Sequence, residues 1–301
     1  MRIGISVSSS YMVEDPRVGA RYMVERARAA RQAELDSLFV GDHHVTATPY
    51  FQNSPILGRM LAEWGPRPAG ALYLLPLWNP VLLAEQVATL ASIAEGPFIL
   101  QCGLGGERRQ SLGMGVDLKH RAAMFELSLN TLRALWRGEE VSLQRFWPVS
   151  RARISPLPPT PIDVWIGAMA APAINRTARM AEGWLASPAL TLAQAAEGLN
   201  IYRQACAEHQ RTPSAVAIRR DVYVGASSQE ARSVVAPYLA KGYRGFSEEA
   251  LLFGSVSEVA DQMAALAEIG FGDVIVRNIS SDQVEALATI ERLAEVKAAL
   301  A

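Results

Sequence analysis

The chain contains 301 residues, half of them hydrophobic and a fifth charged, and its formal net charge is −1. This balance is typical of a globular protein with a large core, and without a basic or acidic block it argues against binding to nucleic acid or to a membrane surface. The two cysteines, Cys102 and Cys206, lie far apart and predict neither a disulfide framework nor a metal site.

Short aliphatic runs alternate with longer helical patterns along the whole chain. Strands are predicted at residues 2–8, 37–41, 69–75, 97–103, 164–168, 184–187, 215–224 and 274–277. Helices are predicted at residues 18–34, 80–94, 120–137, 172–181, 192–207 and 281–300. Most of these strands are apolar on both faces, which is the pattern of parallel strands covered by helices.

Eight such units predict a single α/β domain over residues 1–301, a (β/α)8 TIM barrel, since this fold typically needs about 250 residues. Two stretches are predicted as insertions: residues 139–161 after the fourth helix of the barrel, and residues 244–255 before the eighth strand. An open doubly wound sheet is the alternative. Its dinucleotide fingerprint is matched only weakly, at residues 103–108, where Arg108 replaces the third glycine.

The N-terminal segment lacks the charged and apolar regions of a signal peptide. No apolar run approaches the roughly 18 residues that a membrane helix needs. Together with the sparse cysteines, these features predict a cytoplasmic protein that does not enter a membrane.

The end of the second predicted strand, Asp42-His43-His44, carries the most informative polar cluster. The carboxyl ends of the strands form the active-site face of such a barrel, and histidine beside a carboxylate suits proton transfer. Neighbouring strand residues point in opposite directions, and no third ligand is apparent, so no metal site is predicted. The alternative is that both histidines are hydrogen-bonded spacers.

The fifth predicted strand ends in a run of small residues before a helix. Gly167, Ala168, Met169 and Ala170 leave the backbone N–H groups at the helix N-terminus accessible, as an anion site requires. Arg176 follows one turn later. The alternative is that the alanines only pack the helix against the barrel. Other polar side chains expected near strand ends are Ser8, Ser9, Asn79, Gln101, Arg219, Arg220, Arg277 and Asn278.

Four segments in the same order resemble the bacterial luciferase-like family, which includes flavin monooxygenases and deazaflavin-dependent oxidoreductases. They are LDSLFVGDHHV, AGALYLLPLWNPVLLAEQVATLASIAEG, GMGVDLKHRAAMFELSLNTLRALWRGEE and VWIGAMAAPAINRTARMAEGW. The resemblance implies a (β/α)8 barrel that binds FMN or coenzyme F420, acts on a small-molecule substrate and forms a homodimer.

The resemblance also assigns roles to residues. Asp42 would contact the ring system of the cofactor, and His43 would act at the reacting centre. Gly70, Ala71 and Leu72 would contain a non-proline cis peptide that forms a bulge against the ring. The phosphate would lie against Gly167, Ala168, Met169 and Ala170, with Arg176 assisting. A further loop, which begins at Gly103, is also expected to contact the cofactor.

Departures from the family pattern bear on the choice of cofactor. Leu104 stands where the luciferases carry a phosphate-binding arginine, for which Arg108 or Arg109 would substitute, and the phosphate loop lacks the frequent serines. The pair Asp42-His43 is more like the deazaflavin enzymes, since luciferases carry Glu-His. We therefore expect hydride transfer between F420 and a small organic substrate. The alternatives are an FMN monooxygenase supplied by a partner flavin reductase, and a cofactor-binding protein without turnover.

Overall fold

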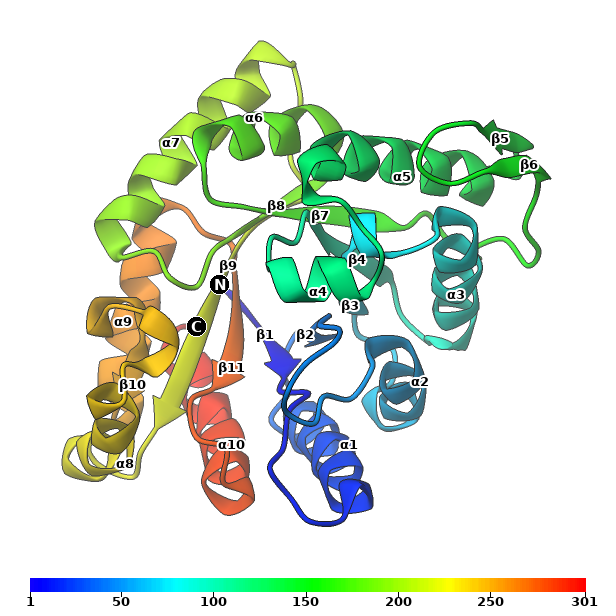
Figure 1. Cartoon of the computed structure of the whole chain (residues 1–301). Helices are drawn as coiled ribbons and strands as arrows, with labels where there is room; N and C mark the ends of the chain where they lie inside the picture. The colour runs from blue at the N-terminus through cyan, green and yellow to red at the C-terminus, as the bar shows by residue number, and fades with distance from the viewer.

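The computed structural model describes residues 1–301, and its central sheet is a closed barrel of parallel strands inside a ring of helices (Figure 1). The barrel strands are β1 (Arg2–Val7), β2 (Ser37–Val40), β3 (Ala69–Leu74), β4 (Phe98–Gly103), β7 (Asp163–Ala168), β8 (Gly183–Ala186), β9 (Ala215–Val224) and β11 (Asp273–Asn278). They follow one another in chain order around the ring, and pairing of β8 with β9 closes it. The predicted TIM barrel is therefore confirmed.

The helices cover the outside of the barrel. They are α1 (Pro16–Gln32), α2 (Asn53–Trp64), α3 (Pro80–Ile93), the short α4 (Arg108–Gly113), α5 (Arg121–Trp136), α6 (Ala171–Met180), α7 (Leu192–Glu208), α8 (Ser228–Ala240), α9 (Val256–Ile269) and α10 (Gln283–Ala299). Helices α2, α4, α8 and α9 lie outside the predicted helix ranges. Helices α2 and α8 each carry a proline, Pro55 or Pro237. Helix α8 also buries only Ala231 and Val235, so the apolar periodicity that marks a helix is weak in it.

Capping side chains and prolines determine where several helices begin. The Asn79 side chain accepts hydrogen bonds from the N–H groups of Val81 and Leu82, and Pro80 occupies the first turn, where its missing N–H does no harm. Ser255 and Glu258 form a reciprocal capping box at the start of α9. These caps fix where each chain segment leaves a strand end and turns back along the barrel.

The barrel interior is filled by a small apolar cluster that is separate from the larger core between strands and helices. It consists of Phe39, Ile99, Trp165, Leu185, Ala215, Ala217 and Ile275. All come from alternate positions of their strands, as inward-facing residues must. This cluster plugs the middle of the barrel, so ligands meet only the layer above it.

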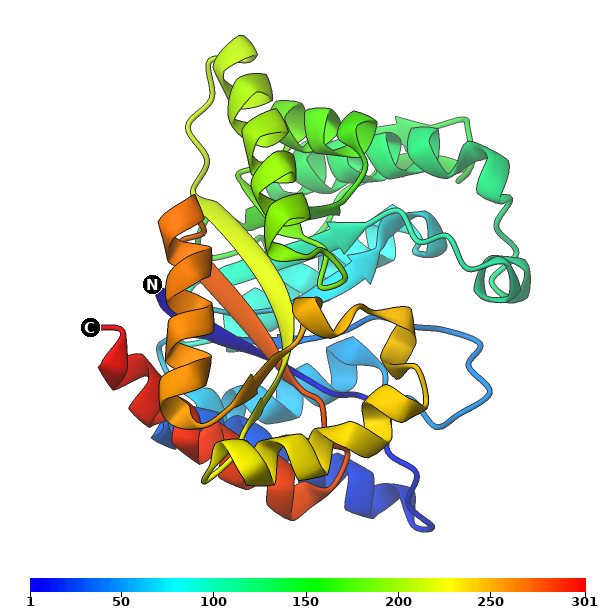
Figure 2. The same cartoon turned by 90° about the vertical axis from the view of Figure 1, so that its left-hand side faces the viewer.

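Both predicted insertions are present. The first contains an antiparallel hairpin of β5 (Val141–Leu143) and β6 (Val149–Ala152), which projects from the rim in Figure 1. The second contains the short turns η3 (Tyr243–Gly245) and η4 (Glu248–Ala250) and the strand β10 (Leu252–Gly254). β10 pairs with the C-terminal end of β9 outside the ring. Figure 2 shows this region packed between α8 and α9.

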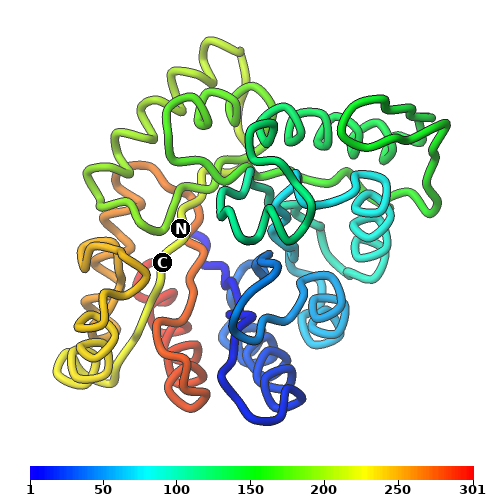
Figure 3. Tube along the Cα trace, viewed as in Figure 1, coloured from blue at the N-terminus to red at the C-terminus, as the bar shows by residue number.

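The two chain ends lie close together in both the ribbon and the tube views (Figures 2 and 3). None of the helices combines the length and the sustained apolar character needed to cross a lipid bilayer. The remaining short turns are η1 (Leu75–Leu77), directly after β3, and η2 (Leu118–His120), directly before α5.

Gly70 on β3 is required by close packing between strands. A Cβ atom there would lie 1.8 Å from the carbonyl oxygen of Ile99 on β4. Replacing Gly70 with Ala forces the strands apart, so we expect the free energy of unfolding to fall by about 1–3 kcal/mol in urea denaturation. Gly106→Ala is the control, because nothing lies within 4 Å of its Cβ position. Equal stability of the two variants would contradict the packing argument.

Candidate functional site

The barrel mouth above the apolar plug is polar. Gln101, Arg219 and Arg277 lie two residues beyond Ile99, Ala217 and Ile275, so strand alternation aims them into the same space. Gln101 is buried, and Arg219 and Arg277 are half-buried. These side chains come from three different strands of the ring, as expected of a site at the carboxyl ends of a TIM barrel.

Asp42 ties the end of β2 to the end of β3. Its side chain has no exposed surface, and Oδ2 accepts hydrogen bonds from the Leu74 N–H at 2.8 Å and from Trp78 Nε1 at 2.9 Å. His44 Nε2 lies 3.0 Å from Oδ1, and the His44 ring packs edge-on against Trp78. The carboxylate therefore orients Trp78 and His44, while its direct contact with a cofactor ring stays a prediction.

His43 lies in a different environment from His44. Its ring packs edge-on against Tyr50, with 5.6 Å between the ring centroids. The Tyr50 hydroxyl occupies the space that a Cβ of Gly41 would fill, at 2.7 Å from that position, on the inner side of the barrel. Burial raises the pKa of the Tyr50 phenol, and the positive charge of Arg277 opposes part of this effect. A histidine and a phenol are thus paired at the mouth, and both can exchange protons.

Arginines dominate the charge on the side of the mouth formed by β9 and β11. The Asp221 side chain is completely buried, and its Oδ2 accepts hydrogen bonds from the Tyr243 hydroxyl and from Arg244 Nη1, both at 2.8 Å. Arg219 Nη2 lies 3.5 Å from Asp221 Oδ1, and Arg277 Nε donates to Ser8 Oγ at 3.0 Å. Two guanidinium groups, those of Arg219 and Arg244, therefore lie against one carboxylate, and Arg277 adds a third positive charge to this side of the mouth.

Arg219 keeps its charge despite its surroundings. Burial lowers the pKa of Arg219 to about 10, and the negative charge of Asp221 counteracts part of this shift. The guanidinium is therefore still a cation at neutral pH. Its Nε atom is buried without a hydrogen-bond partner, and Nη2 is held only by the ion pair with Asp221. Such a group stabilises negative charge that develops next to it.

The expected phosphate loop is accessible. Helix α6 begins after Ala170, which provides no side-chain cap, and the Met169 side chain is exposed. A Cβ at Gly167 would meet only the Cys102 carbonyl oxygen, at 3.6 Å, so the backbone there is open to close approach. Arg176, however, points to α5, where its Nε donates to Glu126 Oε1 at 3.0 Å. Its contact with a phosphate stays a prediction.

The segment Gly70-Ala71-Leu72 does not have the expected backbone. The single cis peptide bond of the chain precedes Pro156, so the predicted non-proline cis peptide in β3 is wrong. The physical reason is that β3 pairs with β4 in continuous register, from Ala69 opposite Phe98 to Leu74 opposite Gly103, which leaves no bulge. Leu72 lies opposite Gln101 at the level of the mouth, Gly70 lies one layer lower opposite Ile99, and Ala71 packs in the core outside the barrel. Contact of these residues with a cofactor stays a prediction.

Several buried polar atoms near the mouth lack a hydrogen-bond partner. They are Ser9 Oγ, Gln101 Nε2 and Arg219 Nε. Asp42 Oδ1 and His44 Nε2 are satisfied by each other, and Asp221 Oδ1 and Arg219 Nη2 form an ion pair. Unpaired polar groups in a protein interior are costly and call for a ligand or water. A planar heterocycle with carbonyl and N–H groups at its edge would provide partners for donors such as Gln101 and Arg219. The mouth therefore fits a flavin-like ring.

The sequence identified part of this site. It pointed to Asp42, His43, Gln101, Arg219 and Arg277, but it missed Tyr50, Trp78, Asp221, Tyr243 and Arg244. The missed aromatic residues lie in loops that only the fold brings to the mouth. The sequence could have identified Asp221, because charged residues at positions 219 and 221 of an otherwise apolar strand lie on the same face. No three His, Cys, Asp or Glu side chains are grouped as a metal site.

Comparison with known proteins places the chain in a family. The model of the luciferase-like monooxygenase domain matches residues 1–250. An F420-dependent glucose-6-phosphate dehydrogenase of Nakamurella multipartita is 27% identical over 190 residues, which cover 58% of this chain and 54% of that protein. The chain thus matches about half the length of this curated relative.

Two solved structures share the fold at low sequence identity. One is the oxygenating constituent of 3,6-diketocamphane monooxygenase from Pseudomonas putida in complex with FMN, with a TM-score of 0.82, 17% identity, and coverage of 98% of this chain and 97% of that one. The other is an F420-dependent secondary alcohol dehydrogenase with an F420–acetone adduct, with a TM-score of 0.82, 16% identity, and coverage of 100% and 99%. By the extent of the domain match and by its fold, the chain belongs to the luciferase-like monooxygenase family.

Proposed function

We propose that the protein is an oxidoreductase that transfers hydride between coenzyme F420 and a small organic substrate at the barrel mouth. The observation that carries this proposal is the layer of buried, unpartnered polar atoms at the mouth, close to a histidine–tyrosine pair. The similarity to F420-dependent dehydrogenases and the pair Asp42-His43 favour F420 over FMN.

The residues of the mouth have distinct roles in this proposal. When bound, the deazaflavin supplies the hydride chemistry, and the protein supplies binding, orientation and protons. His43 takes or gives the proton that accompanies hydride transfer, and the Tyr50 phenol keeps its ring in place. Arg219 stabilises negative charge that develops on the ring or the substrate. Asp42 acts through Trp78 and His44, which it holds at the edge of the site.

The phosphate of the cofactor would lie against Gly167, Ala168, Met169 and Ala170. The uncapped N-terminus of α6 supports this, because its free N–H groups and the helix dipole favour an anion. Gly103, at the end of β4, leaves room beside this loop, since the nearest atom to its Cβ position is 3.5 Å away. Arg176 forms an ion pair with Glu126, and this pair limits the positive charge that Arg176 would contribute to phosphate binding.

An FMN-dependent monooxygenase is the second candidate, favoured by the FMN-bound neighbour of the same fold. It would use reduced flavin from a partner reductase and would consume oxygen. A cofactor-binding protein without turnover is the third. Oxygen uptake with reduced FMN would favour the second candidate, and any catalytic turnover would exclude the third.

Cofactor titration separates the first two candidates. Purified protein is titrated with F420 and, separately, with FMN, while cofactor absorbance and thermal stability are followed. We expect F420 to stabilise the protein by about 2.7 kcal/mol at a hundredfold excess over Kd, with no comparable effect of FMN. Tight binding of FMN alone would refute the F420 proposal, and would require Arg108 or Arg109 to replace the missing phosphate contact.

Replacement of His43 by alanine tests its role in proton transfer. The rate is measured with an alcohol or sugar phosphate that wild-type protein oxidises with F420. We expect kcat to fall by about 10²–10⁴ while the Kd for F420 changes little. The control is His209→Ala, which removes an exposed histidine between α7 and β9, at the opposite end of the barrel. Wild-type kcat in the His43 variant would show that this histidine is only structural.

A further inference from the structure

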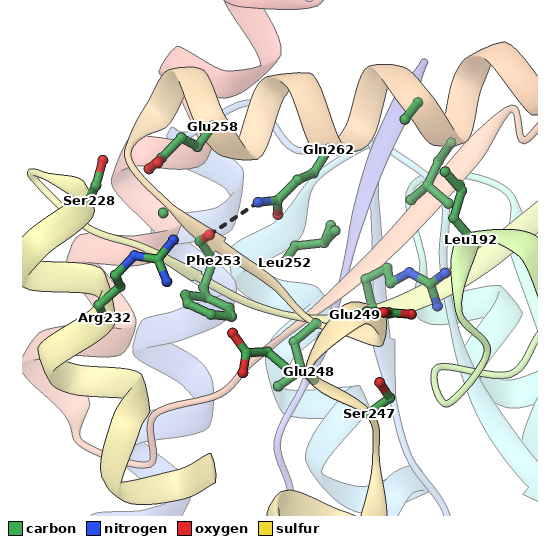
Figure 4. Close-up of a pocket in the computed structure, with 15 residues that line it drawn as sticks. Leu192, Ser228, Arg232, Ser247, Glu248, Glu249, Leu252, Phe253, Glu258 and Gln262 are labelled. Atoms are coloured by element: carbon green, nitrogen blue, oxygen red, sulfur yellow. Dashed lines mark hydrogen bonds between the residues drawn. The ribbon is translucent and has the colours of Figure 1, made fainter.

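A second cavity lies outside the barrel, between α8, β10 and α9, with a volume of about 680 Å³ (Figure 4). Arg220 on β9 forms part of its wall. Because Arg219 and Asp221 face the barrel mouth, strand alternation directs Arg220 to the outer face. The cavity is therefore separated from the mouth by the strand itself.

Arg220 is a buried cation that forms no ion pair. The residue is only 2% exposed, and no carboxylate lies within 4.0 Å of its guanidinium. Its Nη1 donates only to the carbonyl oxygens of Pro188 and Arg219, each at 3.4 Å. Burial lowers the pKa of Arg220 to about 10, and the negative charge of Asp221 counteracts part of this shift, so the group remains charged at neutral pH. A buried cation without an ion-pair partner is costly, and an anionic ligand would lower that cost.

Gln262 on α9 supplies a second unsatisfied group. Its Nε2 donates to the Phe253 carbonyl oxygen at 3.2 Å, the contact drawn as a dashed line in Figure 4. Its Oε1 is buried and accepts no hydrogen bond. Since an amide oxygen is only an acceptor, the missing partner must be an N–H or O–H group.

The rest of the lining limits the ligand further. Apolar walls come from Leu192, Leu251, Leu252, Phe253 and Leu266. Glu248 and Glu249 also line the cavity, are exposed and form no ion pair, so they repel groups with several negative charges. At the other end, Glu258 is engaged with Ser255 in the cap of α9 and lies near Arg232 (Figure 4). The lining of the cavity therefore best matches a ligand that carries a single negative charge on an apolar body.

We propose that this cavity binds a small monocarboxylate that has an apolar body and one N–H or O–H donor. Arg220 binds the carboxylate, Gln262 Oε1 accepts the donor, and the leucines enclose the body. The site goes beyond the proposed redox function and does not depend on it. Inorganic phosphate and phosphorylated compounds are disfavoured by Glu248 and Glu249.

Matched ligands test the proposal by isothermal titration calorimetry on the full chain. N-acetyl-L-leucine offers the carboxylate, the N–H and the apolar body, and N-acetyl-L-leucinamide lacks only the charge. We expect the acid to bind with a Kd below about 1 mM, and neither the amide nor inorganic phosphate to bind comparably. Failure of the acid to bind, or equal binding of acid and amide, would overturn the proposal.

Variants identify the groups responsible. Arg220→Met should weaken binding of N-acetyl-L-leucine by about thirtyfold or more, because it removes the charged partner of the carboxylate. Gln262→Leu should also weaken it. Arg203→Met is the control, since Arg203 likewise donates to a backbone carbonyl, that of Ile269, but does not line the cavity. Unchanged affinity in Arg220→Met would overturn the assignment.

The stability of ligand-free Arg220→Met separates a binding role from a structural one. If Arg220 is a buried cation without an ion-pair partner, kept for a ligand, its replacement by a neutral side chain of similar length should raise the Tm by about 2 °C or more. If Arg220 instead serves to cap the carbonyls of Pro188 and Arg219, the Tm should fall, and the proposal fails.

Discussion

Closure of the strands into a barrel forces every second side chain into an interior that water does not fill. In the middle of this barrel the inward positions are Phe39, Ile99, Trp165 and their apolar neighbours. One layer higher, the same alternation presents Gln101, Arg219 and Arg277. The apolar plug therefore lies directly below a polar layer, and a ligand that enters the mouth contacts that layer.

Two fully buried carboxylates organise the rim of the mouth. Asp42 holds Trp78 and the end of β3, whereas Asp221 holds Tyr243 and Arg244 of the second insertion. Buried carboxylates are tolerated only when hydrogen bonds and opposite charges compensate them. Each aspartate therefore ties a loop to the end of a barrel strand. This explains how loops distant in sequence can form a precise polar surface.

Strand β9 gives its two neighbouring arginines different functions. Arg219 faces the barrel and adds positive charge at the mouth, whereas Arg220 faces α8 and α9 and lines the outer cavity. Burial lowers the pKa of both arginines, and each stays charged at neutral pH. In the two proposals, one strand supplies an anion-binding group on each of its faces.

The sequence by itself determined the fold, because eight apolar strands with helices between them leave few other arrangements. It also located Asp42 and His43, since polar residues directly after a buried strand must lie at its carboxyl end. Tertiary structure alone decided that His43 pairs with Tyr50, that Arg176 pairs with Glu126, and that β3 has no cis peptide. These features depend on contacts between segments far apart in the chain, or on strand register, and periodicity along the sequence carries no information about either.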